Sequence, residues 1–343
     1  MFLLQNYSLK QLNTFGIAIN AKLYADISSE ADLTEVFANP IVKENKLLVL
    51  GGGSNMLFTK EYDGLVLKIS IKGINVESAK SVEKQGDDVF VTAGAGEVWD
   101  SLVKYCVAKG YAGLENLTLI PGTVGASPIQ NIGAYGVEIK DVFESCTAFE
   151  IATGQIKTFT KADCGFAYRE SVFKGKLKGQ YIITSVTYKL SRKANLQTHY
   201  GAINSELERR GITQPTIADV SEVVAAIRVS KLPDPSTIGN AGSFFKNPII
   251  DKEVFDELLS KFPDMPYYPA PDGRVKLAAG WLIESCGFKG IVEGNTGTWK
   301  NQALVLVNHG GATGQEVYRF SEKIIHTVQQ KFGVSLEREV NIL

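Results

Sequence analysis

Hydrophobic residues near the start of the chain fall into short runs that are typical of strands. The runs 23–27 and Lys46–Leu50 each predict a strand. Between them, Ser29 precedes Asp32 by three residues, which is the spacing of a capping box and predicts the start of a helix. The second run ends in the glycine turn 51–55, so the segment has the strand–helix–strand order of an α/β unit.

The middle of the chain adds further strands and one helix. Residues 89–93 read as a strand, and a helical apolar stripe that ends at Gly110 follows it. That stripe consists of Trp99, Leu102, Val103, Cys106 and Val107. Residues 147–151 and 155–159 predict a hairpin about Thr153 and Gly154, and residues 181–190 predict another strand. This half is therefore expected to be α+β, with glycine loops placed after strands.

Helical patterns dominate the last third of the chain. Residues 218–230 and 254–262 predict two helices, and a third apolar stripe ends before Gly333. That stripe consists of Val317, Phe320, Ile324, Val328 and Phe332. Residues 334–342 then alternate as a strand would, which places Glu337 and Glu339 on its polar face. Two glutamates in this pattern are compatible with a face that simply meets water.

The stretch 119–136, LIPGTVGASPIQNIGAYG, stands apart from this periodic pattern. It contains four glycines and two prolines and has no charged residue, so neither a long helix nor a long strand is expected in it. Its glycines allow positive φ angles or close approach of the backbone. Two explanations fit: main chain that offers N–H groups to an anion, or a buried structural loop at a domain junction.

Composition narrows the class of protein. The 343 residues include 36 basic and 37 acidic side chains, a balance that argues against binding of nucleic acid through phosphate neutralisation. Cys106, Cys146, Cys164 and Cys286 are scattered, and the three histidines have no metal-ligand spacing, so neither a disulfide framework nor a metal site is expected. No apolar run is long enough for a transmembrane helix, and no signal peptide is seen. We expect a cytoplasmic protein that does not insert into membranes.

The turn 51–55, GGGSN, is not a known nucleotide fingerprint. Met56 occupies the place of the third glycine of G-x-G-x-x-G, and the P-loop pattern is absent as well. Three glycines after a strand could hold a pyrophosphate through the backbone, but they also suit a plain turn.

Five motifs in one order resemble the UDP-N-acetylenolpyruvoylglucosamine reductases, the MurB family of flavoenzymes. They are GGGSN at 51–55, the stretch 119–136, YRES at 168–171, GSFFKNP at 242–248 and LEREV at 336–340. The resemblance extends from Asn13 to Val340, and the segment around Tyr200 is similar to the longer subtype, which carries a tyrosine loop over its substrate.

This resemblance implies a two-part FAD-binding fold of the vanillyl-alcohol-oxidase type, followed by a C-terminal α/β substrate-binding domain. The expected domains are residues 1–70 and 71–212 for FAD and residues 213–343 for the substrate, with a catalytic glutamate on the final strand. The chain is expected to be monomeric.

The resemblance implies that FAD is bound by the two glycine segments. Because Ser54 and Asn55 stand where related folds attach flavin through His or Cys, the FAD should be bound non-covalently. The expected contacts are Gly51, Gly52, Gly53, Ser54, Asn55, Pro121, Gly122, Gly125, Ala126, Ser127, Asn131, Gly133, Ala134, Tyr135 and Gly136.

The implied reaction takes hydride from NADPH through FAD to the enolpyruvyl group of UDP-N-acetylglucosamine enolpyruvate, giving UDP-N-acetylmuramate for peptidoglycan synthesis. By resemblance, Arg169 holds the carboxylate, Glu339 steadies the enolate and Ser243 donates the proton. Lys231 could support Ser243 electrostatically. The residues expected to hold the rest of the substrate are Tyr200, Arg228, Lys231, Asn247, Tyr268 and Lys276.

Other interpretations remain open at this level. A flavin oxidase of the same fold and a non-catalytic sensor of nucleotide sugar or flavin both fit the glycine segments. Arg169 could instead form a structural ion pair, for example with Glu170. Arg338 breaks the apolar face of the final strand, and a pairing with a nearby acid would explain it. No arginine in the sequence can be assigned to the extra phosphate of NADPH, so the sequence does not reveal a preference for NADPH over NADH.

Overall fold

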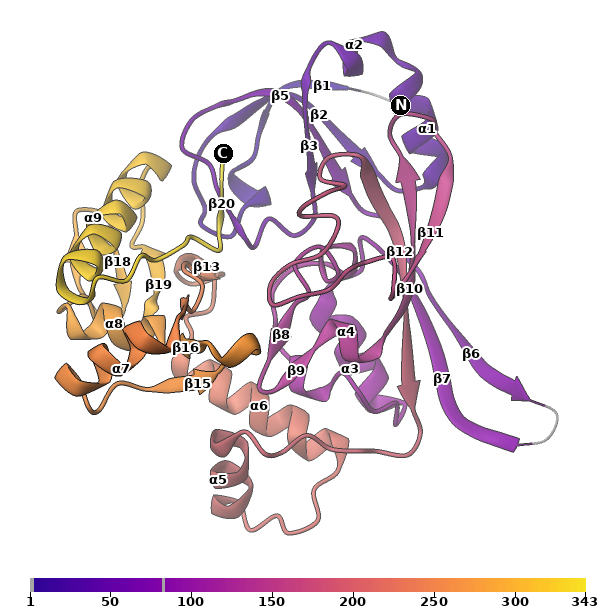
Figure 1. Ribbon diagram of the computed structural model, residues 1–343. Helices are drawn as coiled ribbons and strands as arrows, with labels where there is room; N and C mark the ends of the chain where they lie inside the picture. The colour runs from indigo at the N-terminus through magenta and orange to yellow at the C-terminus, as the bar shows by residue number, and fades with distance from the viewer. Residues whose placement is uncertain (1–2, 82–83) are drawn as a thin grey trace. The chain divides into compact units, whose positions relative to one another are not determined.

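The computed structural model describes residues 3–81 and 84–343, which pack into two compact units (Figure 1). Neither unit is continuous in sequence. The first unit contains the chain up to Tyr7 together with Ala21–Gly52 and Asp63–Arg228. The second unit contains Ser8–Asn20, Gly53–Tyr62 and Val229–Leu343. The three-part division into domains 1–70, 71–212 and 213–343 stays a prediction.

The first sheet has four strands in the order β1-β2-β5-β3. These are β1 (Leu4–Ser8), β2 (Asn20–Ile27), β5 (Tyr62–Ile69) and β3 (Lys46–Leu50). Strands β3 and β5 are parallel, and the helices α1 (Glu30–Ala38) and α2 (Pro40–Lys43) lie between β2 and β3 in the chain. The capping box at the start of α1 is confirmed, because Ser29 Oγ accepts from Asp32 N at 3.2 Å and the Asp32 carboxylate accepts from Ser29 N at 3.0 Å.

The second sheet of the first unit is antiparallel, with the order β11-β10-β12-β7-β6. Its strands are β6 (Ile74–Ser81), β7 (Lys84–Gly94), β10 (Phe143–Glu150), β11 (Ile156–Thr160) and β12 (Tyr181–Ser191). The predicted hairpin about Gly154 is confirmed in β10 and β11. Helix α3 (Trp99–Ala108) follows β7 and ends before Gly110, whose φ is 74°.

The stretch 119–136 contains only short regular elements. After the 3-10 turn η2 (Glu115–Leu117) come a second such turn, η3 (Val124–Ala126), and the two-residue strand β8 (Gly133–Ala134). Strand β8 pairs with β9 (Val137–Glu138), and α4 (Ile139–Val142) leads into β10. This agrees with the expectation that no long helix or strand runs through the glycine-rich segment.

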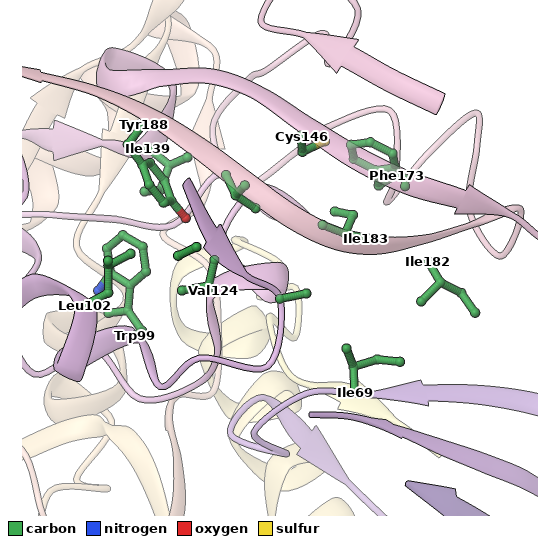
Figure 2. Packing of buried hydrophobic residues seen from close by; sticks show 14 of the residues in the cluster. Ile69, Trp99, Leu102, Val124, Ile139, Cys146, Phe173, Ile182, Ile183 and Tyr188 are labelled. Carbon is green, nitrogen blue, oxygen red and sulfur yellow. The ribbon is translucent and has the colours of Figure 1, made fainter. Parts of the chain in front are cut away.

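A large apolar core holds the first unit together (Figure 2). Trp99 and Tyr188 are its largest fully buried side chains, and their rings meet edge to face at 5.8 Å. Their polar atoms are also paired: Trp99 Nε1 donates to Leu117 O at 2.9 Å, and the Tyr188 and Ser127 hydroxyls are 2.8 Å apart. The core therefore anchors the glycine-rich stretch at Ser127.

Helices α5 (Gly201–Arg209) and α6 (Ile217–Lys231) form a smaller cluster of their own. It is built from Ile203, Leu207, Val220, Val223, Val224 and Ile227. The ring of Tyr135, from the glycine-rich stretch, packs against this cluster. The chain between the two helices passes through Gly211, which has a φ of 69°.

The second unit is built on a sheet in the order β13-β19-β18-β17. Its strands are β13 (Gly239–Ser243), β17 (Val292–Glu293), β18 (Thr296–Trp299) and β19 (Gln302–Asn308). Helices α8 (Ala279–Ser285) and α9 (Gly314–Phe332) pack on this sheet. The apolar stripe predicted for α9 is buried, and Gly333 ends the helix with a φ of 68°.

The remaining elements of the second unit are short. A small sheet has the order β14-β16-β15, with β14 (Ile249–Ile250), β15 (Tyr267–Pro269) and β16 (Val275–Leu277). Helix α7 (Lys252–Lys261) follows β14, and 3-10 turns occur at η1 (Lys10–Leu12) and η4 (Pro271–Gly273). Strand β20 (Asn341–Ile342) pairs in parallel with β4 (Met56–Leu57).

The strand predicted over residues 334–342 is wrong in extent. Only Asn341–Ile342 forms a strand, and Arg338 makes a single bridge to Phe245. The alternation itself is present, because Val334, Leu336 and Val340 are buried. The pattern therefore correctly indicated an extended segment with one buried side. The irregular GSFFKNP segment beside it does not supply a continuous hydrogen-bonding partner, so no longer strand forms.

Candidate active site

Within the first unit, the glycines that begin the turn 51–55 closely approach the glycine-rich stretch 119–136. A Cβ atom added to Gly52 would lie 2.9 Å from Gly122 Cα, and one added to Gly51 would lie 2.6 Å from Thr123 Oγ1. A Cβ added to Gly125 would lie 2.6 Å from Ala95 Cβ. These distances are too short for real side chains, so glycine is required for the turns to approach. The predicted close approach of the backbone is confirmed, and the result is a concentration of bare main chain that suits a phosphate ligand.

A half-buried lysine supports the first of these turns. Lys68, on β5, donates from Nζ to the carbonyl of Gly51, and burial lowers the pKa of its ammonium group. Its positive charge therefore lies beside the turn that is expected to hold a diphosphate. Lys68 could not be singled out from the sequence, because a lysine near the end of an apolar strand gives no signal of its own.

Two polar side chains of the glycine-rich stretch are used within the fold. Asn131 is fully buried, and its Nδ2 donates to Glu138 Oε2 and to Ala167 O, both at 3.0 Å. Its Oδ1 accepts from Lys140 N at 3.0 Å. Like Ser127, Asn131 shapes the loop through its side chain, and a contact of either residue with FAD stays a prediction.

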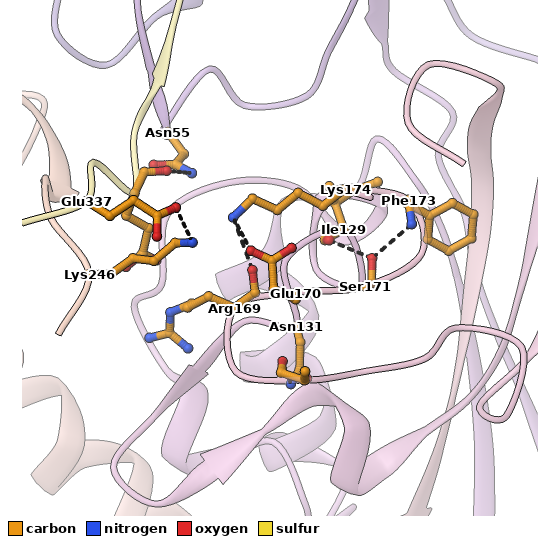
Figure 3. Close-up of polar contacts among 12 residues, drawn as sticks. Asn55, Ile129, Asn131, Arg169, Glu170, Ser171, Phe173, Lys174, Lys246 and Glu337 are labelled. Carbon is orange, nitrogen blue, oxygen red and sulfur yellow. Dashed lines mark hydrogen bonds and ion pairs between the residues drawn. The ribbon is translucent and has the colours of Figure 1, made fainter. Parts of the chain in front are cut away.

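Arg169 is anchored to the same loop. Its Nη2 donates to Gly133 O at 2.9 Å, and its guanidinium carbon lies 5.2 Å from the centre of the Tyr168 ring. The neighbouring Ser171 donates to Ile129 O at 2.6 Å, and Lys174 contacts both Arg169 O and the Glu170 carboxylate (Figure 3). The YRES segment is therefore fixed against the glycine-rich stretch. The sequence also allowed a structural ion pair between Arg169 and Glu170. In the structure, Glu170 forms an ion pair with Lys174 at 3.4 Å.

Backbone strain is concentrated in this region. Leu119, Asn131, Tyr135 and Arg169 have φ angles of 58°, 45°, 50° and 58°, in the left-handed region. For a residue with a Cβ this conformation costs about 1–2 kcal/mol. Strained backbone of this kind persists where the surroundings hold it, and it is common at ligand-binding sites.

Tyr135, Tyr200 and Arg228 form a second cluster in the first unit. The rings of Tyr135 and Tyr200 meet edge to face at 5.3 Å, and the Tyr200 side chain remains exposed. Arg228 hydrogen-bonds to Tyr135, while its Nε is buried without a partner among the described residues. Burial lowers the pKa of this guanidinium, although an arginine stays charged at neutral pH. A buried cation with an unused donor is suited to an anionic ligand.

The second unit brings the segments of Ser243 and Glu339 together. Ser243 ends β13, and the next residue, Phe244, accepts from Glu339 N at 2.9 Å. Asn55 Nδ2 donates to Glu339 O at 3.3 Å, and Asn341 donates to Asn55 O at 2.9 Å. Residues far apart in sequence therefore place Asn55, Ser243 and Glu339 in adjoining segments.

The two neighbours of Glu339 have structural partners. Glu337 is 71% exposed at its side chain and pairs with Lys246 at 2.5 Å (Figure 3). Arg338 donates to Ser321 Oγ at 2.8 Å, lies 4.4 Å from the centre of the Tyr318 ring and meets Glu322 at 3.8 Å. The pairing of Arg338 with a nearby acid is thus confirmed, and α9 supplies that acid.

The remaining candidates of the second unit lie on separate elements. Asn247 Oδ1 accepts from Ala279 N at 3.0 Å, at the start of α8. Tyr268 and Lys276 face each other across β15 and β16, with the ammonium 5.8 Å from the ring centre. Lys231 is exposed at the end of α6. The roles of these four residues in substrate binding stay predictions.

Within residues 3–81 and 84–343, no three acidic, histidine or cysteine side chains gather as metal ligands would. Over the same described residues, no helix combines the length and apolarity that a membrane crossing requires.

Comparison with known proteins agrees with this geometry. A model of the UDP-N-acetylenolpyruvoylglucosamine reductase C-terminal domain matches residues 234–343, and an FAD binding domain model matches residues 21–160. The UDP-N-acetylenolpyruvoylglucosamine reductase of Chromobacterium violaceum is 50% identical over 98% of this chain and 97% of its own. That of Flavobacterium johnsoniae is 50% identical over 98% of both chains.

Solved structures show the same fold. The UDP-N-acetylenolpyruvylglucosamine reductase (MurB) from Thermus caldophilus superposes with a TM-score of 0.65 over 99% of this chain and 98% of its own, at 22% identity. 6-Hydroxy-D-nicotine oxidase from Arthrobacter nicotinovorans gives a TM-score of 0.52 over 92% of this chain and 81% of its own, at 15% identity. At such identities these matches concern the fold alone.

Proposed function

The chain belongs to the UDP-N-acetylenolpyruvoylglucosamine reductases, and from this premise we propose how its residues perform the reaction of that family. It is an FAD-dependent oxidoreductase of peptidoglycan precursor synthesis. We propose that it uses NADPH to convert UDP-N-acetylglucosamine enolpyruvate to UDP-N-acetylmuramate. Neither the oxidase nor the sensor alternative is needed to explain relatives that are 50% identical over nearly the whole chain.

The residues of the glycine turns fit an FAD. Main chain of Gly51, Gly52 and 122–126 would hold the diphosphate, and the ammonium of Lys68 would add positive charge beside it. No cysteine or histidine lies in the turn 51–55, so the FAD is held without a covalent bond. When bound, FAD supplies hydride transfer from NADPH to the terminal carbon of the enolpyruvyl ether.

Arg169 binds the carboxylate of the enolpyruvyl group in this proposal. Hydride addition to the double bond spreads negative charge onto the adjacent carbon and the carboxylate, so a cation at that carboxylate stabilises the transition state. The anchoring of Arg169 to Gly133 and Tyr168 holds its guanidinium in one orientation, which favours a bidentate contact with a carboxylate.

Ser243 and Glu339 complete the chemistry. The developing carbanion needs a proton, which the Ser243 hydroxyl donates, while Glu339, as a protonated carboxyl group, donates a hydrogen bond that steadies the enolate. The observation that supports this assignment is the pairing of Phe244 with Glu339, which places both side chains on adjoining segments of one unit. Serine is a weak acid, so its donation depends on being held over the reacting carbon.

The two glutamates of the LEREV motif give a matched test of this proposal. Glu339→Gln should lower kcat for reduction of the enolpyruvyl nucleotide sugar by about a hundredfold, because a group at the reacting centre is changed. Glu337→Gln should leave kcat nearly unchanged, because an exposed ion pair such as Glu337–Lys246 contributes little. Both variants are assayed with NADPH under steady-state conditions. Equal rates in the two variants would remove Glu339 from the mechanism.

The nucleotide diphosphate of the substrate needs cations and hydrogen-bond donors. Arg228 supplies a buried guanidinium with an unused Nε donor, and the exposed Tyr200 hydroxyl can reach a ligand from the same cluster. We propose that Lys231, Asn247, Tyr268 and Lys276 bind other parts of the nucleotide sugar. We further propose that Lys231 supports Ser243 electrostatically.

The setting of the enzyme is proposed on more general grounds. The cysteines are free thiols, and Cys106, Cys146 and Cys164 are buried, which suits a reducing compartment and favours the cytoplasm. The formal charge of −1 gives no reason to expect nucleic acid as a partner. We propose a monomer in which residues 1–70 and 71–212 bind FAD and residues 213–343 bind the substrate.

A further inference from the structure

A long irregular segment carries Tyr200 in the first unit. It comprises residues 192–200, between the end of β12 at Ser191 and the start of α5 at Gly201. Most of these residues are exposed, and Leu196 packs on the α5–α6 cluster. A segment of this length fixes the position of Tyr200 only if the rest of the protein holds its backbone.

The side chain of Asn116 is hydrogen-bonded to the backbone of this segment. Asn116 lies in η2 and is 1% exposed. Its Nδ2 donates to Gln197 O at 2.8 Å and to Tyr135 O at 3.1 Å. A side-chain amide nitrogen has two hydrogens, so both donors are used, one on each segment. One buried amide therefore joins the backbone of the tyrosine segment to that of the glycine-rich loop.

The two segments joined by Asn116 also carry the two rings that meet. Tyr135 and Tyr200 are in edge-to-face contact at 5.3 Å, and the pKa of Tyr135 is raised, chiefly by burial. Arg228 hydrogen-bonds to Tyr135 and so belongs to the same arrangement. The two backbone segments that Asn116 joins therefore carry the two rings of the cluster to which Arg228 also belongs.

The loop that contains Asn116 is itself rigidly held. Thr118 and Ser221, on α6, have their hydroxyls 2.7 Å apart, and Leu119 N donates to the Asp100 carboxylate at 2.7 Å. The Glu115 carboxylate accepts from Gly113 N at 2.6 Å. Asn116 thus projects from a fixed base, as an orienting residue must.

We propose that Asn116 is a positioning residue for substrate binding: its amide fixes Tyr200 over the nucleotide diphosphate by tying residue 197 to residue 135. Asn116 acts through Tyr200 and touches neither the substrate nor the reacting atoms. This inference rests on the proposed function, because it takes from it that Tyr200 contacts the nucleotide sugar.

The test measures binding and hydride transfer separately. Asn116→Leu keeps the shape of the side chain and removes both hydrogen bonds, and Asn116→Asp replaces the donor with an acceptor that opposes the two carbonyls. Each should weaken binding of UDP-N-acetylglucosamine enolpyruvate to the oxidised holoenzyme, measured by calorimetry without NADPH, by about tenfold. The FAD content and the rate at which NADPH bleaches the flavin should be unchanged. Hydrogen exchange of residues 195–200 should be faster in both variants.

Two further variants make the outcome decisive. Gln197→Ala removes an exposed side chain but keeps the carbonyl that Asn116 uses, so it should bind the nucleotide sugar normally. Tyr200→Ala tests the proposed function: normal binding by this variant would refute the role of Tyr200, and with it any action of Asn116 through that residue. If Tyr200→Ala binds weakly while both Asn116 variants bind normally, the inference about Asn116 alone is wrong. Loss of FAD or of flavin reduction in both Asn116 variants would assign the residue a structural role instead and would equally overturn the inference.

Discussion

Replacing Ser243 with alanine should separate the two halves of the reaction. In Ser243→Ala, NADPH should still bleach the flavin at the normal rate, because the hydroxyl takes no part in that step. Recovery of the flavin absorbance on adding the enolpyruvyl nucleotide sugar should slow by about a hundredfold to ten-thousandfold, the contribution expected of a well-placed proton donor.

Rapid-mixing absorbance at the flavin maximum measures both halves in one preparation. Ser335→Ala is a suitable control, because Ser335 is exposed and lies in the same unit. Normal recovery of the absorbance in Ser243→Ala would show that the proton comes from another group, and the role of Ser243 would have to be given up.

The second large effect concerns the glycine turns. Gly52→Ala should abolish retention of FAD, because the new Cβ would lie 2.9 Å from Gly122 Cα and would push two main chains apart. The backbone of Gly122 cannot move aside as the end of a flexible side chain can, so the main chain that is expected to hold the FAD diphosphate is displaced. The wild-type protein should be yellow and should release FAD on acid denaturation, since no covalent link is expected.

Flavin absorbance per protein, after gel filtration, measures this effect. The control is Gly175→Ala, since a Cβ at Gly175 would have as its nearest neighbour Ser171 O at 3.7 Å, an ordinary contact. A yellow Gly52→Ala protein with a full complement of FAD would contradict the assignment of this turn to the cofactor.

Local patterns in the sequence predicted several of the regular elements. The capping box at Ser29, the hairpin about Gly154 and the apolar stripe of α9 were all identified correctly, because each depends on residues only a few positions apart. The segment 334–342 failed for the opposite reason. Whether an extended segment becomes a strand depends on its partner, and that partner lies about a hundred residues earlier in the chain.

The discontinuous units could not be predicted from local patterns either. Residues 8–20 join the C-terminal part of the chain through long-range contacts. Thr14 Oγ1 donates to Asn240 O at 2.6 Å, and Asn308 Nδ2 donates to Phe15 O at 2.8 Å. Contacts between a side chain and a distant carbonyl produce no periodic pattern in either segment, so they cannot be predicted from the sequence alone.

Some residues of the candidate site could be identified from the sequence, and others only from the fold. Glycines and motif residues were visible in the sequence, because their types are unusual for their positions. Lys68 and Asn116 were missed, since a lysine on a strand and an asparagine in a turn are ordinary until the fold shows which carbonyls they meet. Conversely, Ser127 and Asn131 stand in a ligand-like motif, yet their side chains bond to other parts of the first unit, Ser127 to Tyr188 and Asn131 to Glu138 and Ala167.

We propose above all that Arg169, Ser243 and Glu339 act on one substrate held beside FAD. A crystal structure of the holoenzyme with UDP-N-acetylglucosamine enolpyruvate measures this directly. We predict that the Arg169 guanidinium holds the enolpyruvyl carboxylate and that Ser243 Oγ lies about 3 Å from the carbon to be protonated. A structure in which these three side chains lie tens of ångströms apart, or in which FAD binds away from the two glycine turns, would contradict the account.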